Sequence, residues 1–323
     1  MKSLQGKLIR RDFIKLVGLS TAAILTPGCN PQYVQASRDI PQKKTNVILC
    51  MTDDQGWGDT GYNGHPVLKT PHLDEMAKVG IKFNRFYSGS TVCLYLAHEA
   101  PHDPFQGPDC PPVRIHGQNE RQVNRDDVPE IYKIMIEELD KDVKKIVDKV
   151  KELGIEENTL IFFFSDNGPT WAGSSGGLRG AKGQTFEGGH RVPAIAYWPG
   201  TIPKGVVNTQ TIMTMDLMPT MAAMAGAQID DLQLDGINIL NTLVYNQPLP
   251  ERTLFWRYIT LAGDTRKAVR KGKWKLVKNP GFTGLFNLNN DLAESTNLAS
   301  NQNYQQTLNQ LTNELNEWEA QFN

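Results

Sequence analysis

The sequence has few cysteines, no excess of charge of either sign and no long apolar run. Four cysteines in 323 residues are too few for a disulfide scaffold. With 34 basic and 35 acidic residues the formal net charge is −1, so the chain lacks the basic field typical of nucleic-acid binding. No apolar stretch reaches the roughly 18 residues that cross a bilayer, so we expect no transmembrane span.

The first forty residues are typical of an export signal. The pair Arg10-Arg11 stands directly before a short apolar stretch, residues 16–25, and small residues follow it. This order predicts export by the twin-arginine route to the periplasm or the cell exterior. A short buried helix is the alternative, but paired arginines at an apolar boundary would serve no core.

Two ways of processing this signal region are compatible with the sequence. Cleavage after Ala36 suits an ordinary signal, whereas Cys29 would carry a lipid anchor. The anchor ranks second, because Thr26 stands where lipoprotein signals usually have leucine. Without Cys29 the chain keeps three cysteines, an odd number that argues against a purely disulfide role.

Continuous apolar runs indicate strands that are buried on both faces. Such runs occupy residues 46–52, 159–164 and 194–198, and helices are expected at 70–80 and 131–153. Buried strands that alternate with helices predict an α/β fold with a mainly parallel sheet flanked by helices. A further strand is expected at 81–87.

The pattern changes beyond residue 250. Short polar–apolar strands are expected at 253–258, 267–277 and 284–288, followed by a helix at 303–321. This predicts a small C-terminal antiparallel sheet with a helix on it. The chain therefore divides into a signal region and linker (1–40), an α/β domain (41–249) and a C-terminal subdomain (250–323).

Two acidic clusters follow two of the predicted buried strands. Asp53 and Asp54 follow the first, and Asp166 and Asn167 follow the second. Because ligands bind beyond the carboxyl ends of strands in open α/β sheets, both clusters should face one crevice. Three carboxylates brought together need a cation, and all-oxygen ligands select a hard ion, Ca²⁺ or Mg²⁺, over zinc or copper. Either pair alone could simply cap a loop.

Two further segments carry groups suited to an anionic substrate. A glycine-rich loop, residues 176–183, should bring Arg179 and Lys182 into the same crevice, where a lysine can bind a sulfate or phosphate oxygen. His102 follows the apolar run at 94–97 and could act as an acid or a base. A mobile surface loop and a structural histidine are the respective alternatives.

Several segments, in order, resemble the arylsulfatases of the alkaline-phosphatase superfamily. Residues 52–59 and 70–74 resemble the opening of that family, and residues 164–168 resemble its second metal segment. Residues 180–193 are similar to its lysine loop. The C-terminal signature is matched by residues 285–288, 294 and 297–298.

The resemblance implies hydrolysis of aryl or carbohydrate sulfates, including sulfated polysaccharides. In the family a cysteine is oxidised to formylglycine, and its hydrate attacks the sulfur. By match, Lys182 would bind a sulfate oxygen and His102 would assist the leaving alcohol. One Ca²⁺ ion would be held by Asp53, Asp54, Asp166 and Asn167.

The sequence departs from the family at the nucleophile. The modification motif is Cys-x-Pro-x-Arg, and Cys93 stands in its place, but residues 94–97 supply neither the proline nor the arginine. Residues 94–102 instead resemble a segment that comes roughly a hundred residues later, a stretch worth two or more βαβ units. Formylglycine at Cys93 is therefore expected only with the motif restored. Residues 110–114, beginning with Cys110, fit the motif by letter but are typical of a proline-rich loop.

We therefore expect a sulfatase-family protein with little or no sulfate-ester turnover. An exported, non-catalytic protein that binds Ca²⁺ or a sulfated glycan is the alternative. A phosphoester hydrolase with another nucleophile is disfavoured, because no serine or threonine directly follows a strand in the right place.

Overall fold

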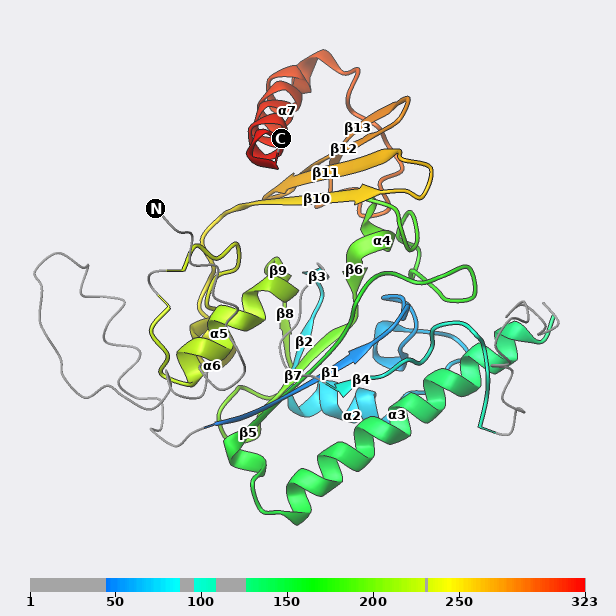
Figure 1. Ribbon diagram of the computed structural model, residues 1–323, viewed down its shortest axis with the longest axis vertical. Helices are drawn as coiled ribbons and strands as arrows, with labels where there is room; N and C mark the ends of the chain where they lie inside the picture. The colour runs from blue at the N-terminus through cyan, green and yellow to red at the C-terminus, as the bar shows by residue number, and fades with distance from the viewer. Residues whose placement is uncertain (1–44, 88–95, 109–125, 230–231, 323) are drawn as a thin grey trace, which may run out of the picture.

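The computed structural model describes residues 45–87, 96–108, 126–229 and 232–322. Within them, a large α/β part carries a smaller antiparallel sheet stacked on one end (Figure 1). The strands of the α/β part are β1 (Asn46–Thr52), β2 (Ile81–Phe83), β3 (Phe86–Tyr87), β4 (Leu96–Ala97), β5 (Thr159–Ser165), β6 (Arg191–Val192), β7 (Ala194–Tyr197), β8 (Val206–Asn208) and β9 (Ile212–Met213). Its helices are α2 (Pro71–Val79), α3 (Val128–Glu152), α4 (Glu187–His190), α5 (Leu217–Met224) and α6 (Leu240–Tyr245).

The central sheet has the strand order β4-β1-β5-β7-β2-β8. The pairs β4/β1, β1/β5 and β2/β8 are parallel, whereas β7 runs antiparallel to both of its neighbours. The prediction of a mainly parallel α/β sheet is confirmed. The register places Thr52 of β1 opposite Ser165 of β5, so these two strands end side by side.

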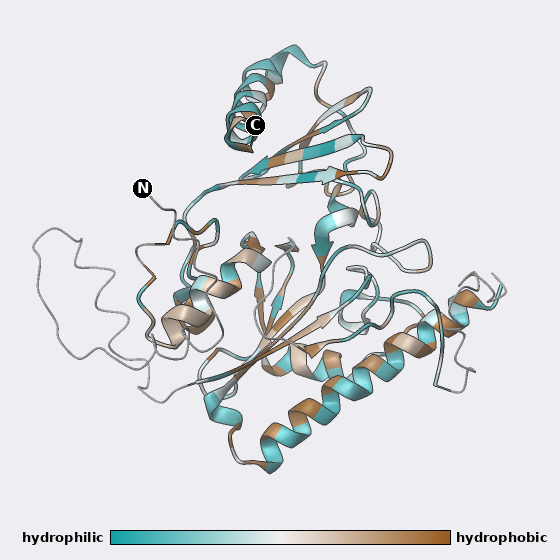
Figure 2. Ribbon diagram, viewed as in Figure 1, coloured by the Kyte–Doolittle hydropathy of each residue, from teal (hydrophilic) through white to brown (hydrophobic). Residues whose placement is uncertain are grey.

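Helices cover both faces of this sheet because its central strands are apolar on both. In β5, Phe162 and Phe164 pack with residues of α5 and α6, whereas Ile161 and Phe163 pack toward α2 and α3. Figure 2 shows α3 with hydrophilic and hydrophobic residues in alternating patches, as expected for a helix with one face on a core.

Helix α2 begins as the sequence predicts, but its start is capped differently. The Thr70 hydroxyl accepts the Gly61 N–H and donates to Asp74 instead of capping the helix. Asp140 of α3 accepts the free N–H groups of His72 and Leu73, at 3.0 and 2.7 Å. A neighbouring helix therefore supplies the cap.

Two of the expected strands are wrong in extent. The strand at 81–87 is two strands: β2 joins the central sheet, and β3 joins a three-stranded sheet of order β6-β3-β9. Phe83 and Phe86 nonetheless enter the same core, which explains why buried aromatic residues occur in both halves of the segment. The strand at 267–277 is also two strands, because the chain turns at Gly272 with a φ of +54°.

The C-terminal sheet is antiparallel throughout and carries a helix, as predicted. Its strands, in the order β10-β11-β12-β13, are β10 (Thr253–Ile259), β11 (Thr265–Lys271), β12 (Trp274–Asn279) and β13 (Phe282–Asn287). Leu311 and Leu315 of α7 (Gln305–Glu319) pack on one face of this sheet. The other face packs on the α/β part through a cluster that includes Tyr87, Trp256 and Phe286.

Short 3₁₀ turns complete the described secondary structure: η2 (Gly61–Asn63), η3 (Glu156–Asn158), η4 (Thr214–Asp216), η5 (Gln302–Tyr304) and η6 (Ala320–Phe322). Among the described residues, no helix is both long enough and apolar enough to cross a bilayer. The signal region, with Cys29, lies outside the described residues.

Candidate active site

The carboxyl ends of β1 and β5 bring the two predicted acidic clusters together. The Asp54 N–H donates to Asp166 Oδ1 at 3.0 Å, and Asn167 Nδ2 donates to Asp54 Oδ1 at 2.8 Å. Asp54 itself adopts a left-handed backbone conformation, with a φ of 67°. This conformation is uncommon for a residue other than glycine and turns the chain sharply where the strand ends.

His102 reaches the same place because β4 pairs with β1. The Asp53 N–H donates to the carbonyl of Ala100 at 3.3 Å, which ties the His102 loop to the end of β1. His102 Nε2 lies 3.5 Å from Asp54 Oδ2, and His102 Nδ1 lies 2.6 Å from the Asp103 carbonyl. Asp53, Asp54 and His102 each offer one potential metal-ligand atom, and these three atoms lie within 4.8 Å of one another.

Lys182 enters from the glycine-rich loop and contacts the same carboxylate. Its Nζ lies 2.5 Å from Asp54 Oδ1, and its backbone N–H donates to the Pro169 carbonyl at 2.9 Å. Arg179 does not enter the crevice, contrary to the prediction. Its guanidinium lies 4.1 Å from the centroid of the Phe186 ring and donates to the Glu294 carbonyl.

A second layer of contacts holds the loop that follows β1, and sequence reasoning did not identify it. The buried Asp59 carboxylate accepts hydrogen bonds from the Gly56 N–H, the Ser174 N–H and the Tyr132 hydroxyl, at 2.9, 2.7 and 2.8 Å. Burial raises the pKa of Asp59 to about 6. A Cβ on Gly56 would lie 2.2 Å from the Ser174 carbonyl oxygen, so glycine is required there.

The electrostatics of the site reflect crowded carboxylates in a partly buried place. Burial and the neighbouring Asp166 carboxylate raise the pKa of Asp53 to about 6, and burial also raises the pKa of Asp166. Burial alone would lower the pKa of His102, but the Asp103 carbonyl and the carboxylate of Asp54 raise it overall. The carboxylates therefore favour cations beside them.

These residues fit a hard divalent cation on the chemistry of their donors. Asp54 is fully buried, and its Oδ2 accepts no hydrogen bond from the described residues. The side chains at the two strand ends supply carboxylate and amide oxygens, the ligands of Ca²⁺ and Mg²⁺. An unsatisfied buried carboxylate oxygen is costly without such a partner. Cys93 and Cys110 lie outside the described residues.

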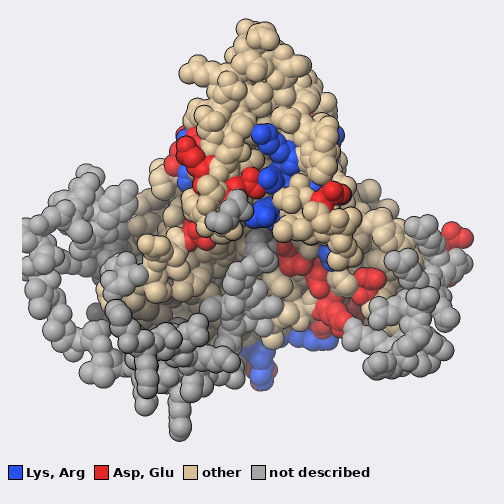
Figure 3. Space-filling model, turned by 45° about the horizontal axis from the view of Figure 1, so that its top comes forward, with Lys and Arg blue, Asp and Glu red and all other residues tan. Residues whose placement is uncertain are grey.

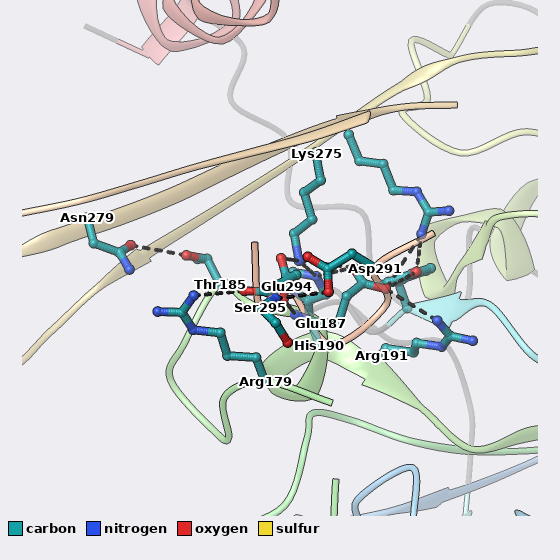
Figure 4. A network of polar contacts seen from close by, with 12 residues as sticks. Arg179, Thr185, Glu187, His190, Arg191, Lys275, Asn279, Asp291, Glu294 and Ser295 are labelled. Atoms are coloured by element: carbon teal, nitrogen blue, oxygen red, sulfur yellow. Dashed lines mark hydrogen bonds and ion pairs between the residues drawn. The ribbon is translucent and has the colours of Figure 1, made fainter. Parts of the chain in front are cut away.

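A buried ionic network joins this region to the C-terminal sheet (Figure 4), and no sequence motif predicts it. Lys275 Nζ of β12 lies 2.9 Å from Glu187 Oε1, 3.0 Å from Glu294 Oε1 and 3.1 Å from His190 Nε2. Arg191 and Arg270 also lie near Glu187. Burial would raise the pKa of Glu187, but Lys275 and the other cations hold it well below its usual range.

Charged side chains of both signs gather at the centre of the face shown in Figure 3, with acidic groups on either side of the basic ones. Lysine and arginine side chains gather along the junction between the C-terminal sheet and the α/β part. Acidic side chains gather below them on the α/β part. Basic and acidic side chains therefore meet where the C-terminal sheet joins the α/β part, the region in which Lys275 also pairs with Glu187.

A comparison with protein families shows to which family this chain belongs. The family model described as Sulfatase matches residues 45–94 and 93–227. The chain belongs to the sulfatase family. A second model, N-sulphoglucosamine sulphohydrolase, C-terminal, matches residues 181–321 of this sulfatase-family chain.

Curated relatives and a solved structure agree with this membership. Bovine (Bos taurus) arylsulfatase A is 43% identical over 145 residues, which cover 43% of this chain and 28% of the bovine protein. The chain therefore matches less than a third of that relative's length. The crystal structure of Ps i-CgsB shares the fold, with a TM-score of 0.75 and 22% identity over 85% of this chain and 93% of that one.

The comparisons also bear on the departure at Cys93. The family match breaks at the same Cys93–Leu94 position where the sequence leaves the family pattern. An alignment with mouse (Mus musculus) N-acetylgalactosamine-6-sulfatase, at 25% identity, extends over 374 positions and covers 71% of each protein. Because 374 positions exceed the whole 323-residue chain, the mouse protein contains stretches that this chain lacks.

Proposed function

We propose that this sulfatase-family chain binds sulfate esters together with Ca²⁺, at the site formed by Asp54, Lys182 and His102, and hydrolyses them weakly or not at all. The observation that carries the proposal is the convergence on Asp54. Lys182, the adjacent pair Asp166 and Asn167, and His102 all reach this one buried residue, from three separate segments.

The ion would be held by the oxygens at the two strand ends. The proposed ligands are Asp53, Asp54, Asp166 and Asn167. When bound, Ca²⁺ would act as a Lewis acid that polarises the sulfate oxygens. Mg²⁺ is the less favoured occupant, because it demands a more regular octahedral geometry and releases its waters reluctantly.

Lys182 would bind a sulfate oxygen directly. Its ammonium group already lies against the Asp54 carboxylate, and it remains 39% exposed on the side chain, so an ester in the crevice can reach it. Because the backbone N–H of Lys182 is held by the Pro169 carbonyl, the side chain starts from a fixed point. A cation fixed in this way is suited to the negative charge on the oxygens of the sulfuryl group while that group is transferred and the alcohol departs.

His102 would deliver a proton to the leaving alcohol. Its Nδ1 is held by the Asp103 carbonyl, which leaves Nε2 on the side of Asp54 and the crevice. The Asp103 carbonyl and the carboxylates of Asp54 and Asp53 raise the pKa of His102, which favours the protonated form of its ring. A protonated Nε2 in this position can act as a general acid.

The nucleophile is the weak point of the proposed hydrolysis. Cys93 is followed by residues that supply neither the proline nor the arginine of the modification motif, so we propose that it stays an unmodified thiol. Only eight residues join the end of β3 to the start of β4. This short connection favours the second candidate function, binding of Ca²⁺ or a sulfated glycan without hydrolysis.

The substrate class proposed here is an aryl or carbohydrate sulfate, including sulfated polysaccharide. Support comes from the names of the relatives, arylsulfatase A and N-acetylgalactosamine-6-sulfatase, and from a Ps i-CgsB structure in complex with k-i-k-neocarrahexaose. We also propose export to the periplasm or the cell exterior, which the twin-arginine pattern at Arg10-Arg11 supports, with Cys29 as a candidate lipid anchor.

Turnover of 4-nitrophenyl sulfate and 4-nitrophenyl phosphate, measured side by side, tests the proposed chemistry. We expect at most slow release from the sulfate ester and none from the phosphate ester. Loss of sulfate release in Cys93→Ala would show an active modified nucleophile and contradict the proposal of weak turnover. Faster release from the phosphate ester would instead indicate a phosphoester hydrolase.

A further inference from the structure

Strand β10 carries a row of large side chains that runs out of the core. Side chains on one face of a strand recur at every second residue, and here they are Leu254, Trp256 and Tyr258. Leu254 and Trp256 are buried in the cluster between the C-terminal sheet and the α/β part. Tyr258 continues the row beyond that cluster, and 44% of it is exposed.

The β10–β11 hairpin lies directly over the lysine loop. Gly183 has a φ of +75°, and a Cβ built on it would lie 3.3 Å from the ring of Tyr258. Arg266, which pairs with Tyr258 in the register of the two strands, donates to the Gly183 carbonyl at 2.7 Å. Tyr258 therefore contacts the residue next to Lys182 in the chain.

A second exposed aromatic ring is tied to the same site from another loop. Trp171 is 58% exposed and lies two residues after Pro169, whose carbonyl holds the Lys182 N–H. Its ring meets that of Phe105 at right angles, with 5.8 Å between the centroids. Phe105 lies three residues after His102, so Trp171 is linked to both proposed sulfate-contacting segments.

Single exposed apolar side chains are ordinary on protein surfaces. These two rings differ because each contacts a segment that carries Lys182 or His102. Aromatic rings provide rigid, partly polar contact area and lose little entropy when a ligand covers them. A sugar ring has an apolar C–H face and hydroxyl groups at its edge, which such side chains can match.

We infer that Tyr258 and Trp171 bind the carbohydrate ring of a sulfated sugar whose sulfate group is held at Lys182. The inference rests on the proposed function, since it needs the sulfate to be anchored at that lysine. It goes beyond that function because it assigns the organic group of the ester to two named side chains. The hairpin that carries Tyr258 belongs to the C-terminal sheet, so both layers of the molecule would contribute to recognition.

Calorimetric titration of the full chain, with Ca²⁺ present, tests this assignment. The ligands are N-acetylgalactosamine 6-sulfate, inorganic sulfate and 4-nitrophenyl sulfate. Tyr258→Ala and Trp171→Ala should each weaken binding of the sulfated sugar roughly tenfold and leave inorganic sulfate unchanged. Tyr258→Phe should retain most of the affinity. Tyr245→Ala is the matched control, because Tyr245 is equally exposed but lies on α6.

The outcomes separate this inference from the proposed function. Wild-type binding of inorganic sulfate, with sugar affinity unchanged within twofold in both alanine variants, overturns the inference and leaves the sulfate site standing. Binding of 4-nitrophenyl sulfate alone, and not of the sulfated sugar, overturns the assignment to a carbohydrate. A wild-type chain that binds none of the three ligands contradicts the proposed function and this inference together.

Discussion

At the scale of single residues, the candidate site depends on a few atoms that strand ends bring together. Asp53, Asp54, Asp166 and Asn167 could be found in the sequence because acidic residues follow two recognisable buried strands. The site also needs Asp59, whose carboxylate ties three segments together. The sequence could not show that role, because two of its three partners, Tyr132 and Ser174, lie more than 70 residues away along the chain.

Arg179 shows why sequence reasoning failed within a correctly identified loop. Arg179 and Lys182 stand three residues apart in one glycine-rich segment, so both were expected in the crevice. The aromatic rings that draw Arg179 away come partly from the C-terminal sheet, namely Phe282 and Phe286. Arg179 and Lys182 are separated only when the C-terminal sheet packs against the α/β part.

Glycine at position 168 should be irreplaceable beside the acidic cluster. A Cβ there would lie 1.9 Å from the Gly188 carbonyl oxygen, and backbone cannot move away cheaply. We expect Gly168→Ala to cost about 3 kcal/mol of unfolding free energy. Gly154→Ala is the control: open space surrounds it and only its φ of +63° opposes the change, so about 1 kcal/mol is expected. Urea denaturation measures both, and equal losses would contradict the steric argument.

His190 should make the stability of the fold depend on pH. Burial and the neighbouring Lys275 lower the pKa of His190 to about 3, against about 6.5 when unfolded. Below about pH 6.5 the His190 ring is protonated in the unfolded state but stays neutral in the folded state. The free energy of unfolding therefore falls as the pH falls. At pH 5 the loss should be about 2 kcal/mol. This loss of stability is measured by urea denaturation of the wild type and His190→Phe, with the midpoints compared at pH 7 and pH 5. An equal pH dependence in both proteins would contradict this reading.

At the scale of elements, the long and regular segments could be predicted and the short ones could not. The α3 period and the fully apolar β5 are visible in the sequence, because each satisfies one strong pattern. The sequence predicts one strand where β2 and β3 form two, since Phe83 and Phe86 are both buried although they belong to different sheets. The pattern of apolar residues predicts which residues are buried, but it does not predict which sheet a residue joins.

The Glu187–Lys275 contact should be essential where α4 meets β12. Lys275→Met would leave Glu187 and Glu294 buried without their shared lysine, and we expect a loss of about 3–5 kcal/mol of unfolding free energy. The control is Lys271→Met on β11, whose partner Glu314 lies nearer the surface; it should cost less than about 1 kcal/mol. Thermal or urea unfolding of the two variants makes the comparison. Similar losses would show that burial of the network contributes little.

At the scale of the whole molecule, the α/β part and the C-terminal sheet share one apolar cluster and one ionic network. Arg179, Glu294 and the β10–β11 hairpin all connect the lysine loop to that sheet. The geometry of Lys182 therefore depends on residues more than 70 positions later in the chain. Local sequence patterns predict the α/β part and the C-terminal sheet separately, but they do not predict how the two pack against each other.

This shared interface predicts that the two layers unfold together. A single calorimetric transition is expected, with the van 't Hoff and calorimetric enthalpies equal. Lys275→Met should lower the temperature of that one transition without splitting it. Two separate transitions in the wild-type protein would contradict a joint fold and make the C-terminal sheet an independent unit.

The central claim is that the ends of β1 and β5 form a Ca²⁺-dependent sulfate-ester site. A calorimetric titration of the full chain with Ca²⁺ tests it most directly, using Asp166→Ala as the site variant and Asp142→Ala, on the exposed face of α3, as the control. The account predicts one bound ion in wild type and in Asp142→Ala, and binding weakened at least tenfold in Asp166→Ala. Absence of binding in wild type, or the same affinity in Asp166→Ala, would contradict it.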